Sequence, residues 1–377
     1  MKLIYGKIPY LLQGIYYKNG INPLYTYKSL IDGEGYIQMY IFNKGKIQYN
    51  AKHVETDDLY IRKNGIGTVF KNKNTLSLKN FSNTNVVFFN NTLYSLYENN
   101  PAYILDPITL KTLNKTRYNY SSHAKVNNTL NILQSIYGGI HTLEYSSIDT
   151  HNNENLYKII TPHRYYIHDF IIQEIQKEFH FIANTFNIDI LHFITGEKSA
   201  LESLQLKNKM YFMTYDFEKN TIKYNYQLDI KGSSLHAINA NDNFIAFIND
   251  NFQFNMLNNT LPYESTSYNI NRNENKQICN LKGEMPKYLH NSLYYIHNYS
   301  LIKYDILQNK KIMYNFKNSI DSIYFIEEPC ITESYILSTV HSTNYTFLYI
   351  FTHNLHNICI LRCDKKLPSF HNIFVKI

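Results

Sequence analysis

The chain has 377 residues, of which 44% are hydrophobic and 18% charged, and its formal net charge is +7. This composition excludes a disordered chain and allows a sizeable core, in one large domain or two of average size. The positive charge is spread along the chain without a lysine or arginine block, so we expect no nucleic-acid partner.

Strand-like segments dominate the sequence from its beginning. An alternating run at 36–42 is followed by a turn at 43–46 and a second run at 47–49, which predicts a β-hairpin. Further strands and strand pairs are predicted at 86–89 with 92–97, at 243–248, at 292–297, and at 335–340 with 345–351. Helical patterns are scarce, and the best two are short, at 171–179 and 197–206.

Runs of strands separated by turns every ten or so residues indicate an all-β sandwich, barrel or propeller. The chain is too long for one sandwich, whereas a propeller of four-stranded blades accommodates this length. No proline- or glycine-rich linker divides the sequence. We therefore predict a single domain over residues 1–377.

The sequence carries no signal of export or membrane insertion. The first residues contain no apolar run of signal-peptide length, and no stretch of eighteen apolar residues occurs. The four cysteines form no C-x-x-C pair, which favours free thiols in a reducing compartment. We expect a cytoplasmic protein, and its modest positive charge is compatible with peripheral contact with a membrane surface.

Four of the fifteen histidines are candidate metal ligands because each lies among apolar residues, as a histidine pointing into a buried site does. They are His123 in SSHAKV, His168 in YIHDFII, His236 in SLHAINA and His371 in LPSFHNIF. Their separations of 45, 68 and 135 residues are far too long for a helical metal motif. They suit one histidine on the inner strand of each of several blades, because these strands converge on the axis of a propeller.

Neutral imidazoles suit iron, zinc, copper and nickel, and they leave the charge of a divalent ion uncompensated. Carboxylates that accept the outer N–H of the imidazoles are therefore expected. Suitable glutamates are Glu98 in LYENN, Glu284 in GEMPK and Glu328 in EEPC.

These residues and their surroundings resemble the carotenoid cleavage oxygenase family, which includes the retinoid isomerase and the stilbene-cleaving enzymes. The opening LQGIYYKNGINP at 12–23 resembles the family's L-x-G-x-Y-x-R-N-G-P-N-P, and DGEGYI at 32–37 resembles D-G-D-G-M-I. The four histidine segments resemble A-H-P-K-V-D, I-H-D-F, H-x-x-N-A and P-x-x-F-H-G-x-F in the same order. The resemblance extends from residue 12 to residue 374.

The resemblance implies a seven-bladed β-propeller with one iron(II) on its axis, bound by His123, His168, His236 and His371. It also implies that Glu98, Glu284 and Glu328 hydrogen-bond three of these histidines. The activity it implies is that of a non-haem dioxygenase, which uses O2 to cleave a double bond of an apolar polyene, a carotenoid or apocarotenoid, to carbonyl products.

Departures from the family pattern keep other functions open. Ala124, Asn127, Glu55 and Asn372 replace the usual residues, but none removes a candidate ligand or its carboxylate. Stilbene-cleaving relatives have a lysine where this chain has Tyr97, which argues against a stilbene substrate. The chain is shorter than typical members, which supports the alternative of a drifted propeller that only binds. An isomerase on the same metal site is a further alternative.

Overall fold

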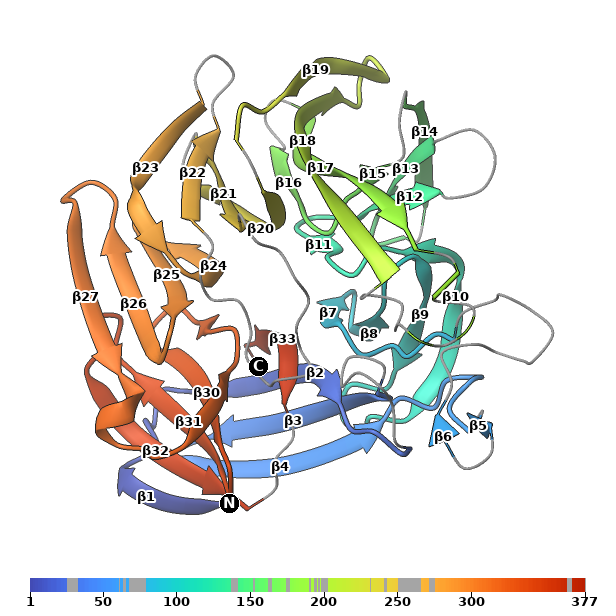
Figure 1. The fold of residues 1–377 in the computed structure, drawn as a ribbon. Coiled ribbons are helices and arrows are strands. Elements are labelled where there is room, and N and C mark those ends of the chain that lie inside the picture. Colours follow the sequence, from blue (N-terminus) through green and yellow to red (C-terminus); the bar gives the residue numbers. More distant parts are fainter. Residues whose placement is uncertain are drawn as a thin grey trace.

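Antiparallel strands, arranged around a common centre, make up the computed structural model of the chain (Figure 1). The structure describes residues 1–25, 33–60, 62–63, 66–67, 79–136, 142–151, 153–161, 165–173, 177–189, 191–192, 195, 197, 203–230, 232–240, 243–249, 266–270, 275–364 and 368–376.

The described strands form seven sheets of four or more strands, which we number in chain order. Sheet 1 contains β33 (Ser369–Val375), β2 (Gly14–Ile21), β3 (Gly35–Asn43) and β4 (Lys46–His53). Sheet 2 contains β7 (Asn85–Phe89), β8 (Thr92–Leu96), β9 (Asn100–Leu105) and β10 (Thr112–Tyr120). Sheet 3 contains β11 (Lys125–Val126), β12 (Leu130–Ile136), β13 (Thr142–Ile148) and β14 (Glu154–Ile160).

The second half of the chain continues this pattern. Sheet 4 contains β15 (Tyr165–Tyr166), β16 (Phe170–Gln173), β17 (Glu178–Ile188), β18 (Leu204–Asp216) and β19 (Thr221–Gln227). Sheet 5 contains β20 (Ser233–Ala240), β21 (Asn243–Asn249), β22 (Thr266–Ile270) and β23 (Asn275–Lys282). Sheet 6 contains β24 (Glu284–Leu289), β25 (Ser292–His297), β26 (Ser300–Asp305) and β27 (Lys310–Asn315).

Sheet 7 uses both ends of the sequence. It contains β28 (Ile323–Ile326), β29 (Cys330–Ile331), β30 (Ile336–Ser342), β31 (Thr346–Phe351), β32 (Asn357–Cys363) and β1 (Lys2–Gly6). A separate two-stranded ribbon joins β5 (Arg62–Lys63) and β6 (Ile66–Gly67), and a short 3-10 helix, η3 (Phe316–Asn318), follows β27.

The sheets are blades of a propeller, because each packs against the next in a ring. Seven buried apolar clusters of described residues lie between neighbouring sheets. One of them, which contains Leu337 and Tyr16, joins sheet 7 to sheet 1 and so closes the ring. Burying alternate residues on both faces of each sheet is how such a ring gains stability from the hydrophobic effect. The predicted all-β propeller is confirmed, and its seven sheets are as many as the blades that the resemblance implied.

The predicted hairpins are confirmed where the structure describes them. Asn43 pairs with Lys46 at the turn between β3 and β4, and both intervening residues, Lys44 and Gly45, have positive φ. Asn90 and Asn91 have positive φ at the turn between β7 and β8. Two consecutive positive φ values are what a two-residue hairpin turn with the right-handed strand twist requires.

The two predicted helices are not borne out in the described residues. Residues 170–173 form β16 and residues from 178 onward form β17, while 174–176 lie outside the described part. Residues 204–206 begin β18, and 198–202 lie outside the described part. The short apolar runs that resembled helix faces pair instead with neighbouring strands, because periodicity over so few residues does not separate the two structures.

Two smaller expectations concern cysteines and membrane helices. Cys330, Cys359 and Cys363 are free thiols, as predicted, whereas the side chain of Cys279 lies outside the described part. Among the described residues, no helix is both long enough and apolar enough to span a bilayer.

The two chain ends close the ring. β1 pairs with β32 in sheet 7, and β33 pairs with β2 in sheet 1, so each terminal segment completes a sheet begun elsewhere in the sequence. A buried ion pair joins the same two sheets, with Lys18 Nζ 2.9 Å from Glu327 Oε2 and both side chains at most 1% exposed. Glu327 Oε1 also lies 2.7 Å from His341 Nε2 and accepts a hydrogen bond from the Ser369 backbone N–H.

Substituting Lys18→Met should lower the free energy of unfolding by about 3–5 kcal/mol, because it leaves Glu327 as a buried charge without its cation. The matched control is Lys52→Met, whose ion pair with Glu55 is about half exposed and should contribute at most about 1 kcal/mol. Denaturant unfolding measures both values. Equal values for the two variants would contradict the closing role of the buried pair.

Candidate metal centre

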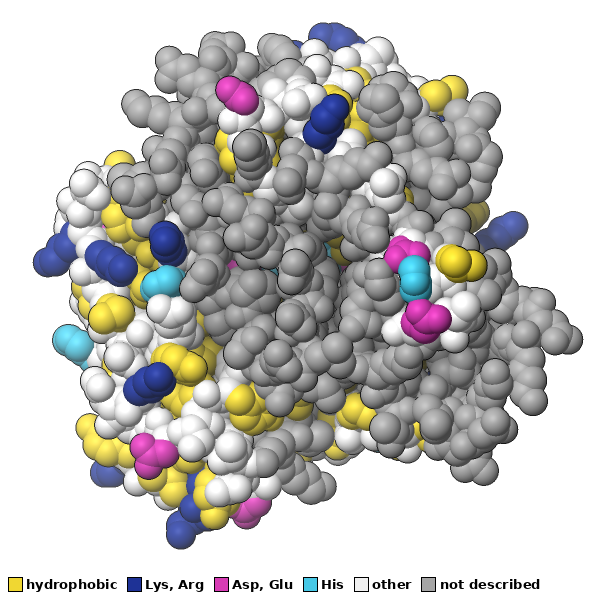
Figure 2. Space-filling model, in the orientation of Figure 1, with side chains coloured by type: hydrophobic (Ala, Val, Ile, Leu, Met, Phe, Trp, Pro, Cys, Tyr) yellow, Lys and Arg dark blue, Asp and Glu magenta, His cyan; other side chains and the backbone are white. Residues whose placement is uncertain are grey.

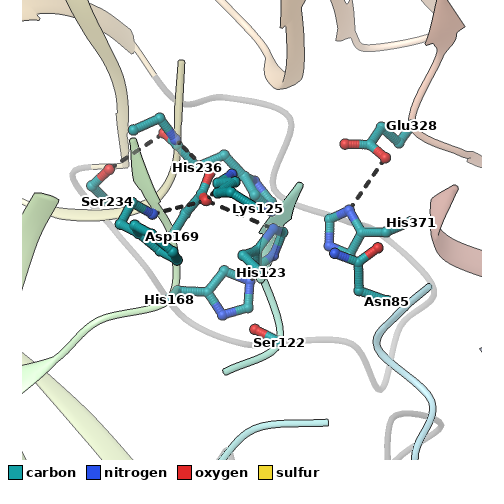
Figure 3. Close-up of polar contacts among 12 residues, drawn as sticks. Asn85, Ser122, His123, Lys125, His168, Asp169, Ser234, His236, Glu328 and His371 are labelled. Atoms are coloured by element: carbon teal, nitrogen blue, oxygen red, sulfur yellow. Dashed lines mark hydrogen bonds and ion pairs between the residues drawn. The ribbon is translucent and has the colours of Figure 1, made fainter. Parts of the chain in front are cut away.

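Four histidines that are far apart in the sequence meet at the centre of the ring. His123 lies two residues before β11, His168 lies between β15 and β16, His236 is in β20, and His371 is in β33. One ring nitrogen of each lies within 4.8 Å of the corresponding nitrogen of every other. The rings face one another in the close-up of the site (Figure 3), and three of the four residues are buried.

Local irregularities in the inner strands aim these side chains. The pairing of β20 with β21 shifts register between Ser234 and Ala237, which places His236 in a bulge. The pairing of β24 with β25 shifts in the same way after Glu284, where Met285 has a φ of +58°. A bulge inserts one extra residue and redirects the neighbouring side chain, so it can turn a residue of a strand toward the centre.

The carboxylates predicted from the sequence lie against the outer nitrogens of three histidines. Glu98 Oε1 is 2.5 Å from His168 Nδ1, and Glu284 Oε2 is 2.7 Å from His236 Nδ1. Glu328 Oε2 is 3.4 Å from His371 Nδ1, within ion-pair distance (Figure 3). The structure therefore brings together all seven residues that the sequence singled out.

This arrangement leaves the inner ring nitrogens, those on the side away from the carboxylates, available to bind a cation. A carboxylate that accepts from Nδ1–H leaves the Nε2 of the same neutral imidazole with a free lone pair. The Nε2 of His236 is buried and has no hydrogen-bond partner among the residues that the structure describes. Burying a polar atom without a partner costs free energy, and His123 Nε2 lies only 3.0 Å from His168 Nε2. The centre therefore has the donors of a metal site and fits a divalent ion.

The pKa values follow the burial and the charges of the site. Burial, and then the neighbouring imidazoles and Lys125, hold the pKa of His123 well below its usual value. Burial also lowers the pKa of His371, despite the opposing effect of Glu328. Both rings are therefore neutral near pH 7, the form that binds a metal. For His236 burial alone would lower the pKa, but Glu284, together with Asp169 and Glu328, outweighs burial, so the pKa is raised.

One of the carboxylates is strongly held in its charged form. Burial alone would raise the pKa of Glu328, but Lys287 and His371 outweigh it and lower the pKa to about 2. Lys287 Nζ lies 3.0 Å from Glu328 Oε1. Glu328 is thus an anion at physiological pH and favours a cation near His371.

Several residues of the site were missed by the sequence reasoning. The hydroxyl group of Tyr166 lies 3.0 Å from His168 Nδ1 and 3.3 Å from Glu98 Oε1. Asp169 lies beside His123 and forms an ion pair with Lys125. Their closeness in sequence to His168 and His123 was the available signal, but it does not reveal contacts that cross between strands.

Comparison with known families identifies the chain. The sequence model of the family described as retinal pigment epithelial membrane protein matches residues 1–296, which is most of the chain. The chain belongs to this family. The resemblance to the carotenoid cleavage oxygenases, read from the motifs, is thereby confirmed.

Curated relatives in this family are named as oxygenases. The chain is 26% identical over 214 residues to lignostilbene-α,β-dioxygenase isozyme III of Sphingomonas paucimobilis, covering 49% of this chain and 43% of the relative. It is 28% identical over 120 residues to resveratrol cleavage oxygenase 1 of Aspergillus fumigatus, covering 29% of this chain and 24% of the relative. The matched regions thus span less than half the length of these relatives.

Solved structures of the family share the fold. Cobalt-substituted Synechocystis ACO superposes with a TM-score of 0.83 at 18% identity, over 99% of this chain and 94% of that one. A variant of Synechocystis apocarotenoid oxygenase superposes with a TM-score of 0.80 at 18% identity and the same coverage. At this identity the likeness establishes the propeller fold.

His236→Ala should abolish stoichiometric metal binding, because it removes one of the four donors, the imidazole that Glu284 holds in place. The matched control is His180→Ala, which removes another buried histidine, one hydrogen-bonded to Thr214 and Gln173. Metal content of the purified proteins after anaerobic reconstitution measures the difference. Full occupancy in His236→Ala would refute the assignment of the centre.

Glu284→Gln should weaken metal affinity about 10- to 100-fold, because a neutral amide holds the His236 ring less firmly than a carboxylate does. Glu144→Gln is the control, since Glu144 accepts a hydrogen bond from Gln134 in sheet 3 and is not one of the carboxylates beside the histidines. Titration of the metal-free proteins gives both dissociation constants. The same constant for Glu284→Gln and the wild type would speak against this role of Glu284.

Proposed function

We propose that the chain binds one iron(II) through His123, His168, His236 and His371 and is a dioxygenase. The proposed reaction cleaves a carbon–carbon double bond of a carotenoid or apocarotenoid to two carbonyl products, with O2 as the second substrate. The observation that carries the proposal is the meeting of four imidazole nitrogens within 4.8 Å in a member of this oxygenase family.

The donor set supports iron(II) without being specific to it, since neutral imidazoles also suit zinc, copper and nickel. The family membership is what favours iron here. When bound, iron(II) would supply the redox chemistry by which dioxygen reacts with a double bond.

The residues of the chain have a positioning role in this proposal. Glu98, Glu284 and Glu328 hold the imidazole rings and keep their outer nitrogens protonated. The burial of the centre keeps bulk water away from the reacting groups. The reaction needs no acid or base from the protein.

The substrate class is proposed from the family, and a stilbene is the second candidate. The names of two curated relatives refer to lignostilbene and resveratrol, which favours a stilbene. Tyr97, which stands where stilbene-cleaving members have a lysine, opposes it because a phenol ring lacks the ammonium charge. Its ring contacts Phe81 edge to face, with centroids 5.9 Å apart. We therefore retain a carotenoid or apocarotenoid as the proposed substrate.

The proposal also covers the domain, the location and the contacts of the protein. We propose one domain over residues 1–377, supported by sheets that contain both chain ends. We propose a cytoplasmic protein in peripheral contact with a membrane, supported by the net charge of +7 and by exposed apolar residues near β1, such as Leu3, Ile4 and Leu11. We also propose that nucleic acid is not a partner, because the sequence has no lysine or arginine block; Figure 2 shows the Lys and Arg of the described residues on one face.

Anaerobic reconstitution with iron(II), followed by incubation with O2 and a panel of polyenes and stilbenes, tests the proposal. We expect one iron per chain and two carbonyl fragments of a carotenoid or apocarotenoid, each labelled when 18O2 is used, with mass spectrometry as the readout. His236→Ala is the inactive control.

Each alternative has its own outcome in this experiment. A geometric isomer without cleavage would indicate an isomerase, and cleavage of stilbenes alone would identify the other substrate class. A protein that binds no stoichiometric metal and forms no product would be a binding scaffold, which would refute the proposed function.

A further inference from the structure

Three histidines of the centre have a glutamate against their outer nitrogen, but within the described part of the chain His123 does not. The carboxylate beside its Nδ1 is Asp169, whose Oδ1 lies 3.8 Å away. This distance is too long for a hydrogen bond, so the interaction is electrostatic. The side chains of both residues are almost fully buried, at 7% and 5% exposure, so it is only weakly screened by solvent.

Asp169 touches the segments of three of the four candidate ligands. It directly follows His168 in the chain, and its Oδ2 accepts a hydrogen bond of 3.2 Å from the backbone N–H of Ala237, the residue after His236. Its Oδ1 forms an ion pair with Lys125, two residues after His123. Figure 3 shows this carboxylate between the strands that carry the histidines.

Several partners hold the carboxylate of Asp169 in one orientation. Oδ1 also accepts a hydrogen bond of 2.9 Å from the backbone N–H of Phe170. Two backbone amides and one ammonium group therefore hold the side chain, and a buried carboxylate with such partners has little freedom to turn. A shift of Asp169 would disturb inner strands from sheets 3, 4 and 5 at once.

The formal charges around the centre support the same role. Four carboxylates lie next to the ligands, Glu98, Glu284, Glu328 and Asp169, and two of them are paired with Lys287 and Lys125. Without Asp169 the surroundings of the ligands would lose one of these negative charges, while the positive charge of Lys125 would remain.

We propose that Asp169 is a positioning residue of the metal centre, which fixes the relative places of His123, His168 and His236 and supplies the negative charge that His123 lacks from a glutamate. This inference rests on the proposed function in one respect, the binding of a divalent metal by the four histidines. The inference adds a fourth carboxylate, that of Asp169, and its partner Lys125 to the three glutamates predicted from the sequence.

The test is titration of the metal-free protein with cobalt(II) under anaerobic conditions, read out by the visible absorption of the bound ion. Asp169→Asn preserves the shape of the side chain but removes its charge. We expect its dissociation constant to rise about 10- to 100-fold and its visible bands to shift, because the rings are held differently.

The matched control is Asp216→Asn. Asp216 is also buried, accepts hydrogen bonds from two backbone N–H groups, and pairs with a lysine, Lys219, but it is the last residue of β18 and does not lie beside the histidines. We expect this variant to unfold at a lower temperature while its affinity and spectrum stay those of the wild type. Equal weakening of cobalt binding in both variants would mean a general loss of stability and would overturn the proposal.

Cobalt titration of Lys125→Met is a second measurement. It tests the electrostatic role of Asp169 even where Asp169→Asn does not fold. The substitution leaves the carboxylate and its backbone hydrogen bonds but removes the neutralising ammonium group, so cobalt should bind more tightly than in the wild type. An unchanged or higher dissociation constant would overturn the electrostatic role of Asp169.

The wild-type titration separates the two proposals. A wild-type protein that binds no cobalt refutes the metal centre and this inference together. A wild type that binds, with an Asp169→Asn variant of the same affinity and spectrum, refutes the role of Asp169 alone.

Discussion

The structure depends on four imidazole nitrogens that meet in a buried place. Each polar nitrogen that is removed from water needs a partner, or its burial costs free energy. The outer nitrogens of His168 and His236 find carboxylates, while the inner nitrogens face one another and His236 Nε2 has no partner among the described residues. A divalent cation is the partner that would satisfy all four inner nitrogens at once.

This centre is tied to the closure of the ring. His371 comes from the C-terminal strand β33, which is part of sheet 1 only because it pairs with β2 near the other end of the chain. The consecutive glutamates Glu327 and Glu328 have different partners. Glu327 forms the buried ion pair with Lys18, and Glu328 lies against His371. A metal that binds only the closed ring would stabilise it by mass action.

Charged groups next to the ligands determine what kind of ion the centre can hold. Lysines paired with Glu328 and Asp169 reduce the negative charge of the surroundings. Buried charges interact strongly because little water screens them. The balance of carboxylates and lysines is therefore part of the site, although none of these groups is a candidate ligand.

The sequence by itself predicted the class of fold and most of the centre. Alternating apolar residues and turn signals predicted strands such as 36–42, because this local pattern needs no knowledge of the rest of the chain. Motifs around His123 and the other histidines predicted the four imidazoles and three glutamates through their resemblance to a family. The predicted helix at 171–179 was wrong because pairing between β16 and β17 outweighed a short periodic pattern.

Only the tertiary structure decided which distant groups meet. The bulge at His236, the distance of 3.4 Å between Glu328 and His371, and the contacts of Asp169 with Lys125 and Ala237 all depend on how separate sheets pack. The spacing of residues along the chain does not contain this information. Packing of one sheet against another brings together residues that lie far apart in the sequence.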